Sequence, residues 1–415
     1  MIISLNDFIE SYFNEEGIAK QSIIIKCGDL YKLTLNSYIG RGAYNTVFFG
    51  KYEKGTSVSK ACILKYFLPI KFFDGNEQTD FSYNLTVSEE QNSLIIEKIE
   101  LGIFSQYNYY IQMIKEYRIS NEKMISLLVS DEVNSFIPKP YEEGIFNFKI
   151  DENLINIDIT NCFMLFAYDS QFSLKKYIEN CDSVTKRLKI LKSIINIIGV
   201  LYYKKSLLML DIKLDNYIYK GNESVENREF KIIDWDSIIE LDESKKVSTS
   251  IKIHTSEGFR PDEVDCFDVD DIGIKSSIFM LGACLYQTVF MPLIKQDQLY
   301  PLPRAGADMV SIRYDERISN AFDALKLNSG FQMKFFEIMD KCYTQDCDSR
   351  YSADDNKTEI KKLSDDVQIL IEIYENRGVH PEVMLNKAMG IAKDIMPKDI
   401  DENLFTNIKE VNVEN

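Results

Sequence analysis

The sequence has few of the features that mark membrane, secreted or nucleic-acid-binding proteins. It contains no run of about eighteen apolar residues, so we expect no membrane span. The opening segment, MIISLNDFIESYFNEEG, lacks a positive start and turns acidic, which does not fit a secretory signal. The net charge of −17 argues against broad binding to nucleic acids or anionic membranes and mildly favours basic partners.

Ligands for a transition metal are also scarce. The chain has two histidines, His254 and His380, and eight cysteines that are scattered along it. Cys342 and Cys347, the two cysteines nearest in sequence, would need further ligands to hold zinc. Scattered thiols favour a reducing compartment, so we expect a cytoplasmic protein; delivery of a secreted effector into a host cytosol stays open as an alternative.

The order of expected elements indicates an α+β protein. The 415 residues suffice for one large two-lobed domain with extensions, and no internal repeat or low-complexity tract interrupts them. The patterns predict, in chain order, an amphipathic helix in 1–20, antiparallel strands in 21–70, a loop at 71–84, helices in 85–130, two strands between 135 and 168, helices from 173 with short strands at 208–220 and 230–240, and a helical tail at 358–415 that breaks near Gly378.

Two segments of the expected β-rich region carry residues that suit a phosphate ligand. In GRGAYNTV (40–47), Gly40 and Gly42 permit close approach of the backbone to a ligand, although a plain β-hairpin turn would use the same glycines. In ACILKYF (61–67), Lys65 is the one cation on an apolar strand. It would need an anion if it faced inward, whereas an edge lysine would extend its charge to water.

The strongest chemical signal is LLMLDIKLDNYIY (207–219). Asp211, Lys213 and Asn216 lie within six residues between two apolar runs. Phosphoryl transfer uses a carboxylate to orient the attacking hydroxyl, a cation near the γ-phosphate and an oxygen ligand for magnesium. This segment supplies all three. A further carboxylate, Asp234, follows the apolar strand of FKIIDWDSIIEL (230–241), where an ordinary acidic turn is the alternative.

The order of these four motifs is similar to that of the protein-kinase family, over about residues 33–365. Two later segments strengthen the resemblance. TSEGFRPDE (255–263) is similar to the end of the kinase activation segment, and DCDSRYSADD (346–355) resembles a late motif of the family. The resemblance implies a buried ion pair between Arg350 and Glu263.

The resemblance also implies where the nucleotide binds. Gly40, Gly42 and Val47 would enclose it, and Lys65 would hold its α- and β-phosphates. The segment FMLFAYDSQFSL (163–174) resembles the strand and hinge of the family, with Phe166 as gatekeeper and the backbone of Ala167 and Tyr168 as partners of the adenine. Glu122 is preferred to Glu116 and Glu100 as the partner of Lys65, which requires an insertion at about 68–112.

For the reaction itself, the resemblance implies Asp211 as catalytic base, Lys213 near the γ-phosphate, and Asn216 and Asp234 as magnesium ligands, with ATP and Mg²⁺ as cofactors. The His and Arg that usually precede the catalytic Asp are replaced by Met209 and Leu210.

The missing arginine predicts activity without phosphorylation of the activation segment. Ser277 replaces an aspartate that the missing histidine would touch, and an apolar contact is expected there.

The resemblance thus predicts a divergent serine/threonine protein kinase. The predicted parts are an extension at 1–32, an N-lobe at 33–168, a C-lobe at 169–357 and a tail at 358–415 that could recruit a partner or self-associate. The expected acceptor is a protein. Two alternatives stay open: a small-molecule kinase of the choline or aminoglycoside type, suggested by Asp234-Trp235-Asp236, and a nucleotide-binding scaffold without activity.

Overall fold

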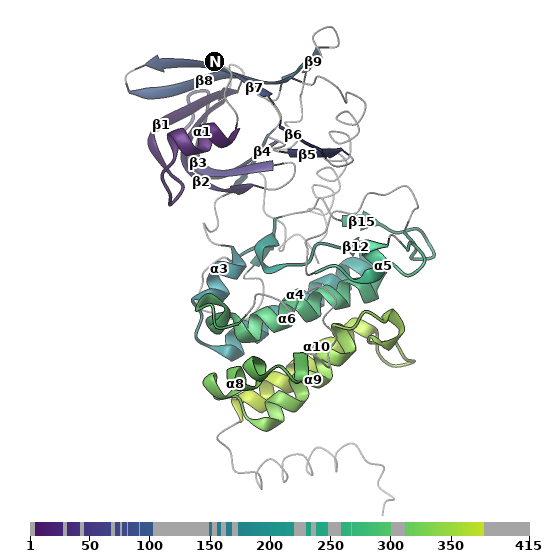
Figure 1. The fold of residues 1–415 in the computed structure, drawn as a ribbon. Helices are drawn as coiled ribbons and strands as arrows, with labels where there is room; N and C mark the ends of the chain where they lie inside the picture. The colour runs from purple at the N-terminus through teal and green to yellow at the C-terminus, as the bar shows by residue number, and fades with distance from the viewer. Residues whose placement is uncertain are drawn as a thin grey trace, which may run out of the picture.

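The protein has an α+β fold in which most strands gather at one end and most helices at the other (Figure 1). We call residues 5–167 the sheet region and residues 173–376 the helical region. The computed structural model describes residues 5–27, 31–41, 45–67, 71–74, 77–80, 82–90, 92–102, 149–151, 156–158, 163–167, 173–219, 230–233, 238–247, 259–266, 268–299 and 312–376.

The sheet region is dominated by one mixed sheet of nine strands, in the order β11-β4-β3-β2-β1-β8-β10-β9, with β7 also paired to β8. Strands β1 and β8 run parallel, whereas β1–β2, β2–β3, β3–β4 and β4–β11 are antiparallel. The elements are α1 (Leu5–Tyr12), β1 (Ile18–Cys27), β2 (Tyr31–Arg41), β3 (Asn45–Lys54), β4 (Lys60–Phe67), β5 (Lys71–Asp74), β6 (Glu77–Asp80), β7 (Ser82–Glu90), β8 (Ser93–Gly102), β9 (Lys149–Asp151), β10 (Asn156–Asp158) and β11 (Phe163–Ala167).

Alternation of apolar residues explains the first strands of this sheet. Ile23 pairs with Leu35 and Ile25 with Leu33, and all four side chains are buried, as expected for strands that turn one face to a core. Phe13, the residue after α1, packs on Phe48 of β3 with ring centroids 5.7 Å apart, and Phe8 of α1 packs on Phe13 at 5.9 Å. The predicted strands of 21–70 and the strand at 163–167 are therefore confirmed.

Two predictions for the insertion are wrong. Residues 85–102 were expected to be helical, but they form β7 and β8, and the expected loop at 71–84 contains β5, β6 and the start of β7. Asn92, in the left-handed conformation with φ 62°, makes the turn between β7 and β8. Pairing of β8 with both β1 and β7 decides the outcome, because it satisfies the backbone of an apolar run that could equally have become helical.

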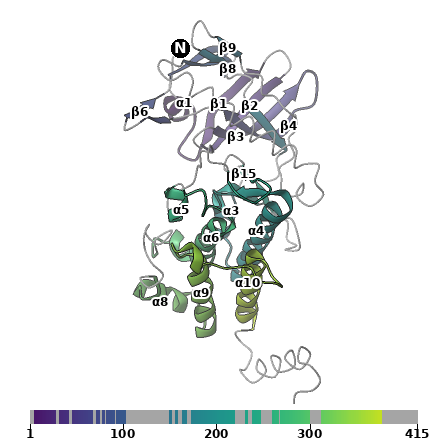
Figure 2. The ribbon, with the colours of Figure 1, turned by 90° about the vertical axis from the view of Figure 1, so that its right-hand side faces the viewer.

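The helical region also contains four short strands, close to where the sequence predicts them. Helices α9 and α10 lie beyond α4 and α6 on the side away from the sheet (Figures 1 and 2). The elements are α3 (Leu174–Glu179), α4 (Val184–Lys205), β12 (Leu207–Met209), η2 (Leu214–Asn216), β13 (Tyr217–Tyr219), β14 (Phe230–Ile232), β15 (Ile238–Glu240), α5 (Asp262–Asp265), α6 (Ile274–Lys295), α8 (Glu316–Ala324), α9 (Ser329–Cys342), η3 (Cys347–Ser349) and α10 (Glu359–Glu375).

Helix α6 is the centre of the helical core. Its length and composition would suit a membrane span, but 89% of its most apolar stretch is buried within the protein. Gly282 allows α9 to pack closely, since a Cβ at this position would lie only 2.7 Å from the Cβ of Cys342. A helix that is apolar on all sides therefore finds its partners inside the fold.

The predicted C-terminal tail starts with a confirmed helix, α10, which belongs to the helical core. Thr358 caps its first turn by accepting a hydrogen bond from the Lys361 backbone N–H, and the Ser364 hydroxyl lies 2.7 Å from the Asn196 side-chain oxygen on α4. Residues 377–415, including Gly378, lie outside the described residues.

Candidate functional site

The segment after β12 presents its polar residues on one side because apolar and polar residues alternate along it. Leu208, Leu210, Ile212 and Leu214 are fully buried in the helical core. Met209 is buried in the same core, whereas Asp211 and Lys213 alternate with the buried residues, so we expect their side chains to point the other way, as successive side chains of an extended chain do. Strands β12 and β15 lie at the end of the helical region that faces the sheet (Figures 1 and 2). The alternation therefore brings Asp211 and Lys213 out of the core at this end.

Asp211, Lys213 and Asn216 form one contact group, which we call the Asp211 triad. The Asn216 amide nitrogen donates to the Asp211 backbone oxygen at 2.7 Å and to its Oδ2 at 2.8 Å. The Lys213 Nζ lies 2.7 Å from the same Oδ2. Asp211 and Asn216 are only 8% and 4% exposed. The carboxylate is therefore fixed in orientation by two donors, one of them charged.

Strand pairing connects the triad to the strand that precedes Asp234. Tyr217 pairs with Ile232, and the Ile233 backbone N–H donates to the Asn216 backbone oxygen at 3.0 Å. The chain immediately before Asp234 thus contacts Asn216. Asp234 itself lies outside the described residues, as do Gly42, Glu122 and Tyr168.

A second group of predicted residues forms a row across four adjacent strands. Gly40 on β2 pairs with Val47 on β3, Val47 pairs with Lys65 on β4, and Lys65 pairs with Met164 on β11. Directly paired residues have their side chains on one face of a sheet. Gly40, Val47 and Lys65 therefore share a face next to the turn between β2 and β3.

Lys65 is not an edge lysine, because β4 lies between β3 and β11 and the residue is only 8% exposed. The alternative in which its charge extends into water is thus wrong. A buried ammonium requires polar or anionic partners, since desolvation of an unpaired charge is costly. Ala167, the last residue of β11, pairs with Cys62 of the same β4 strand.

The contact of Ser277 differs from the prediction. An apolar contact was expected beside the replaced His-Arg pair, but the buried Ser277 hydroxyl donates to the Met209 backbone oxygen at 2.8 Å. On the same helix, the Cys284 thiol donates to the Ile212 backbone oxygen at 3.6 Å. Ser277 thus makes a polar contact after all, because the Met209 backbone carbonyl serves as its partner in place of the missing histidine side chain.

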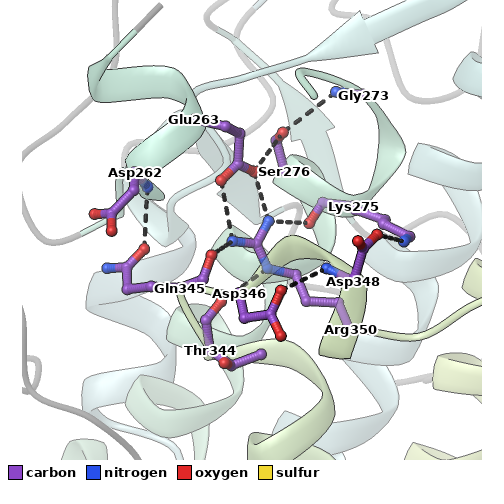
Figure 3. A network of polar contacts seen from close by, with 10 residues as sticks. All are labelled: Asp262, Glu263, Gly273, Lys275, Ser276, Thr344, Gln345, Asp346, Asp348 and Arg350. Atoms are coloured by element: carbon purple, nitrogen blue, oxygen red, sulfur yellow. Dashed lines mark hydrogen bonds and ion pairs between the residues drawn. The ribbon is translucent and has the colours of Figure 1, made fainter. Parts of the chain in front are cut away.

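The predicted ion pair between Arg350 and Glu263 is confirmed. The Arg350 Nη1 lies 2.5 Å from the Glu263 Oε1, and Nη2 lies 3.1 Å from Oε2 (Figure 3). The Ser276 hydroxyl also donates to Oε1 at 2.8 Å. Further guanidinium hydrogen bonds go to the backbone oxygens of Thr344, Gln345 and Lys275.

The described residues contain no group of three or more His, Cys, Asp and Glu side chains that could hold a metal ion. One feature fits magnesium. Since the Asn216 amide nitrogen is bonded to Asp211, its side-chain oxygen is left as a ligand atom, and Mg²⁺ prefers oxygen ligands. Asn216 thus offers an oxygen atom that is compatible with its predicted role as a magnesium ligand.

Sequence reasoning missed the donor role of Cys284 and also missed Lys245. The Lys245 ammonium donates to the Tyr202 backbone oxygen at 3.0 Å and to the Ser206 hydroxyl at 2.7 Å, at the C-terminal end of α4. The spacing of Ser277 and Cys284, about two helical turns, was a usable signal because it puts both on one face of α6. Lys245 gave no comparable signal.

No protein-family model matches the chain, and no curated protein matches it either. The function is therefore inferred from the fold and from the contacts of the Asp211 triad, Lys65 and the Arg350–Glu263 pair.

Proposed function

We propose that this chain is an ATP- and magnesium-dependent phosphotransferase with a two-lobed, protein-kinase-like fold, which transfers the γ-phosphate to a serine or threonine hydroxyl of a protein. The observation that carries the proposal is the Asp211 triad. It holds a carboxylate, a cation and an amide within hydrogen-bonding distance in a nearly buried segment. These are the groups that phosphoryl transfer needs at the acceptor side.

The row across the sheet supports the nucleotide side of the proposal. A glycine-containing turn between two strands and a buried lysine on the next strand are the arrangement that covers and pairs ATP phosphates in protein kinases. Gly40, Val47 and Lys65 follow that order in adjacent strands. The sheet region would then be the N-lobe and the helical region the C-lobe.

In the proposed reaction, the acceptor hydroxyl oxygen bonds to the γ-phosphorus as the bond to the β,γ-bridging oxygen breaks, and ADP leaves. The hydroxyl proton passes to the Asp211 carboxylate and then to solvent. Lys213 would balance charge on the transferred phosphoryl group. Magnesium held by Asn216 and Asp234 would neutralise charge on the phosphates when bound.

The buried pair of Arg350 and Glu263 favours a protein acceptor over a small molecule. In protein kinases, the segment that ends at the corresponding glutamate receives the peptide. Here Glu263 is fixed by Arg350 and Ser276, and Asp262 next to it donates its backbone N–H to Gln345 at 3.0 Å. A segment anchored at this end could support a peptide beside Asp211.

The test compares Asp211→Asn with the parent, using radiolabelled ATP, magnesium and a generic basic protein. We expect the variant to lose transfer by about 10²-fold or more while ATP still raises its melting temperature. Asp215→Asn is the matched control, because Asp215 lies in the same segment but is half exposed and pairs with Lys175. Undiminished turnover of Asp211→Asn would remove Asp211 from the mechanism.

Two other results would favour the alternatives. Nucleotide binding without transfer by the parent would indicate a scaffold. Transfer only to small alcohols or amines would indicate a small-molecule kinase.

A further inference from the structure

Helix α6 contacts the backbone on both sides of Asp211 through two side-chain donors. Ser277 donates to the Met209 carbonyl at 2.8 Å, and Cys284 donates to the Ile212 carbonyl at 3.6 Å. The Asp211 carbonyl accepts from Asn216. Three of the four successive carbonyls from Met209 to Ile212 thus accept a side-chain hydrogen bond, which restricts the peptide planes 209–210, 211–212 and 212–213 around Asp211.

The position of these donors on α6 makes them a firm support. Both residues are fully buried, and about two helical turns separate them, so they share one face of a helix held in the centre of the core. Ser276, next to Ser277, is bonded to the Glu263 carboxylate. In such surroundings, a lost donor leaves a buried carbonyl without its partner, which is costly.

We propose that Ser277 and Cys284 are positioning residues that hold the Asp211 carboxylate in its reactive orientation. This inference rests on the proposed phosphotransferase function. Neither residue touches a reacting atom; each acts through the backbone of the segment that carries Asp211. The pair links the orientation of the proposed base to α6, the helix at the centre of the helical core.

The chemistry of the two donors is unequal. A hydroxyl is a better donor than a thiol, and the sulfur–oxygen distance is long, so Ser277 is expected to contribute more than Cys284. Burial raises the pKa of the Cys284 thiol, which keeps its proton in place as a donor at neutral pH. Serine at position 284 would keep a donor there, whereas alanine would remove it.

The kinetic test uses the full chain with Ser277→Ala, Cys284→Ala and Cys284→Ser. We expect kcat to fall about 10- to 100-fold for Ser277→Ala and less for Cys284→Ala, because small displacements of a catalytic group are expensive. The KM for ATP should change by less than about threefold, since these residues do not hold the nucleotide. Cys284→Ser keeps a donor at this position, so its kcat should be close to that of the parent and above that of Cys284→Ala.

Thr288→Val is the matched control on the same helix. The Thr288 hydroxyl is buried but has no hydrogen-bond partner in the described structure, so its removal should leave kcat unchanged. Equal losses of kcat in Thr288→Val and Ser277→Ala would show a general effect of altering α6 and would overturn the inference.

A second measurement does not depend on activity. Amide hydrogen exchange should become faster in peptides covering 207–219 for Ser277→Ala and Cys284→Ala, with exchange in α9 and α10 unchanged. Unchanged exchange in 207–219, or a uniform rise over the helical region, would overturn the support role. If the parent transfers no phosphate, the proposed function fails, and this measurement alone still decides whether α6 holds the segment.

Discussion

Arg350 and Glu263 are 87 residues apart in the sequence, yet their side chains form a two-point ion pair in which Arg350 is 0% and Glu263 5% exposed. The pair joins the segment after η3 to helix α5, and Ser276 adds α6 to the same contact (Figure 3). The Arg350 guanidinium also lies 5.1 Å from the centre of the Phe279 ring. Three parts of the chain are thereby fixed relative to one another.

Removing one charge of this pair should destabilise the protein strongly. Glu263→Gln keeps the shape of the side chain but leaves the Arg350 charge buried without a counterion. We expect the free energy of unfolding to fall by about 3–5 kcal/mol, the usual cost of breaking a buried pair from one side. Denaturant unfolding measures this change.

The matched control removes a carboxylate charge at the surface. Asp270 pairs with Lys246 at 3.0 Å, but their side chains are 77% and 60% exposed. Asp270→Asn should therefore cost less than about 1 kcal/mol, since solvent screens such pairs. A loss for Glu263→Gln as small as that for Asp270→Asn would show that burial of the pair contributes little.

Substitution by alanine should destabilise the protein at one glycine of the sheet, Gly50, but hardly at another, Gly40. A Cβ on Gly50 would lie 2.1 Å from the Thr34 backbone oxygen, whereas a Cβ on Gly40 would meet nothing within 4 Å. Gly50→Ala should lower the melting temperature by several degrees or prevent folding, and Gly40→Ala should leave it nearly unchanged. If Gly40 covers the nucleotide, Gly40→Ala should instead weaken ATP binding, measured by calorimetry. Similar melting temperatures for the two variants would contradict the prediction.

Features set by neighbouring residues were predictable from the sequence. The Asp211 triad lies within six residues of alternating sequence, so local spacing was enough to predict the group. Strand β8 was not predictable, because Leu94, Ile95 and Ile96 form a continuous apolar run that fits a helix or a doubly buried strand, and its partners are remote. The hydroxyl bond of Ser277 was missed because its acceptor is a backbone carbonyl, which leaves no trace in the residue types.

Acid should weaken the turn that leads into α10. The Lys362 side chain and the backbone N–H groups of Asn356 and Lys357 lower the pKa of Asp354 from 3.8 to about 2. Because the Asp354 pKa is lower in the folded state than in the unfolded state, the charged carboxylate stabilises the fold at pH values above 3.8. This stabilisation is lost as the pH falls towards 2. The melting temperature of Asp354→Asn should thus lie below that of the parent at pH 6. The difference should narrow as the pH falls from 5 to 3, and a constant difference would contradict this assignment.

Activity should not depend on phosphorylation, because a lysine already ties down the chain after β15. Lys245 donates to the Tyr202 carbonyl and the Ser206 hydroxyl at the C-terminus of α4, where the helix dipole also favours a cation. Leu210, the residue before Asp211, is buried and offers no charge to a phosphate. Phosphatase-treated protein should therefore transfer phosphate as fast as untreated protein, and a large loss would contradict the prediction.

Lys245→Met, which keeps the stem without the ammonium, should lower the free energy of unfolding by about 0.5–2 kcal/mol in denaturant unfolding. Lys326→Met is the comparison variant, because Lys326, after α8, and Lys245 are both in the left-handed conformation, with φ 54° and 62°.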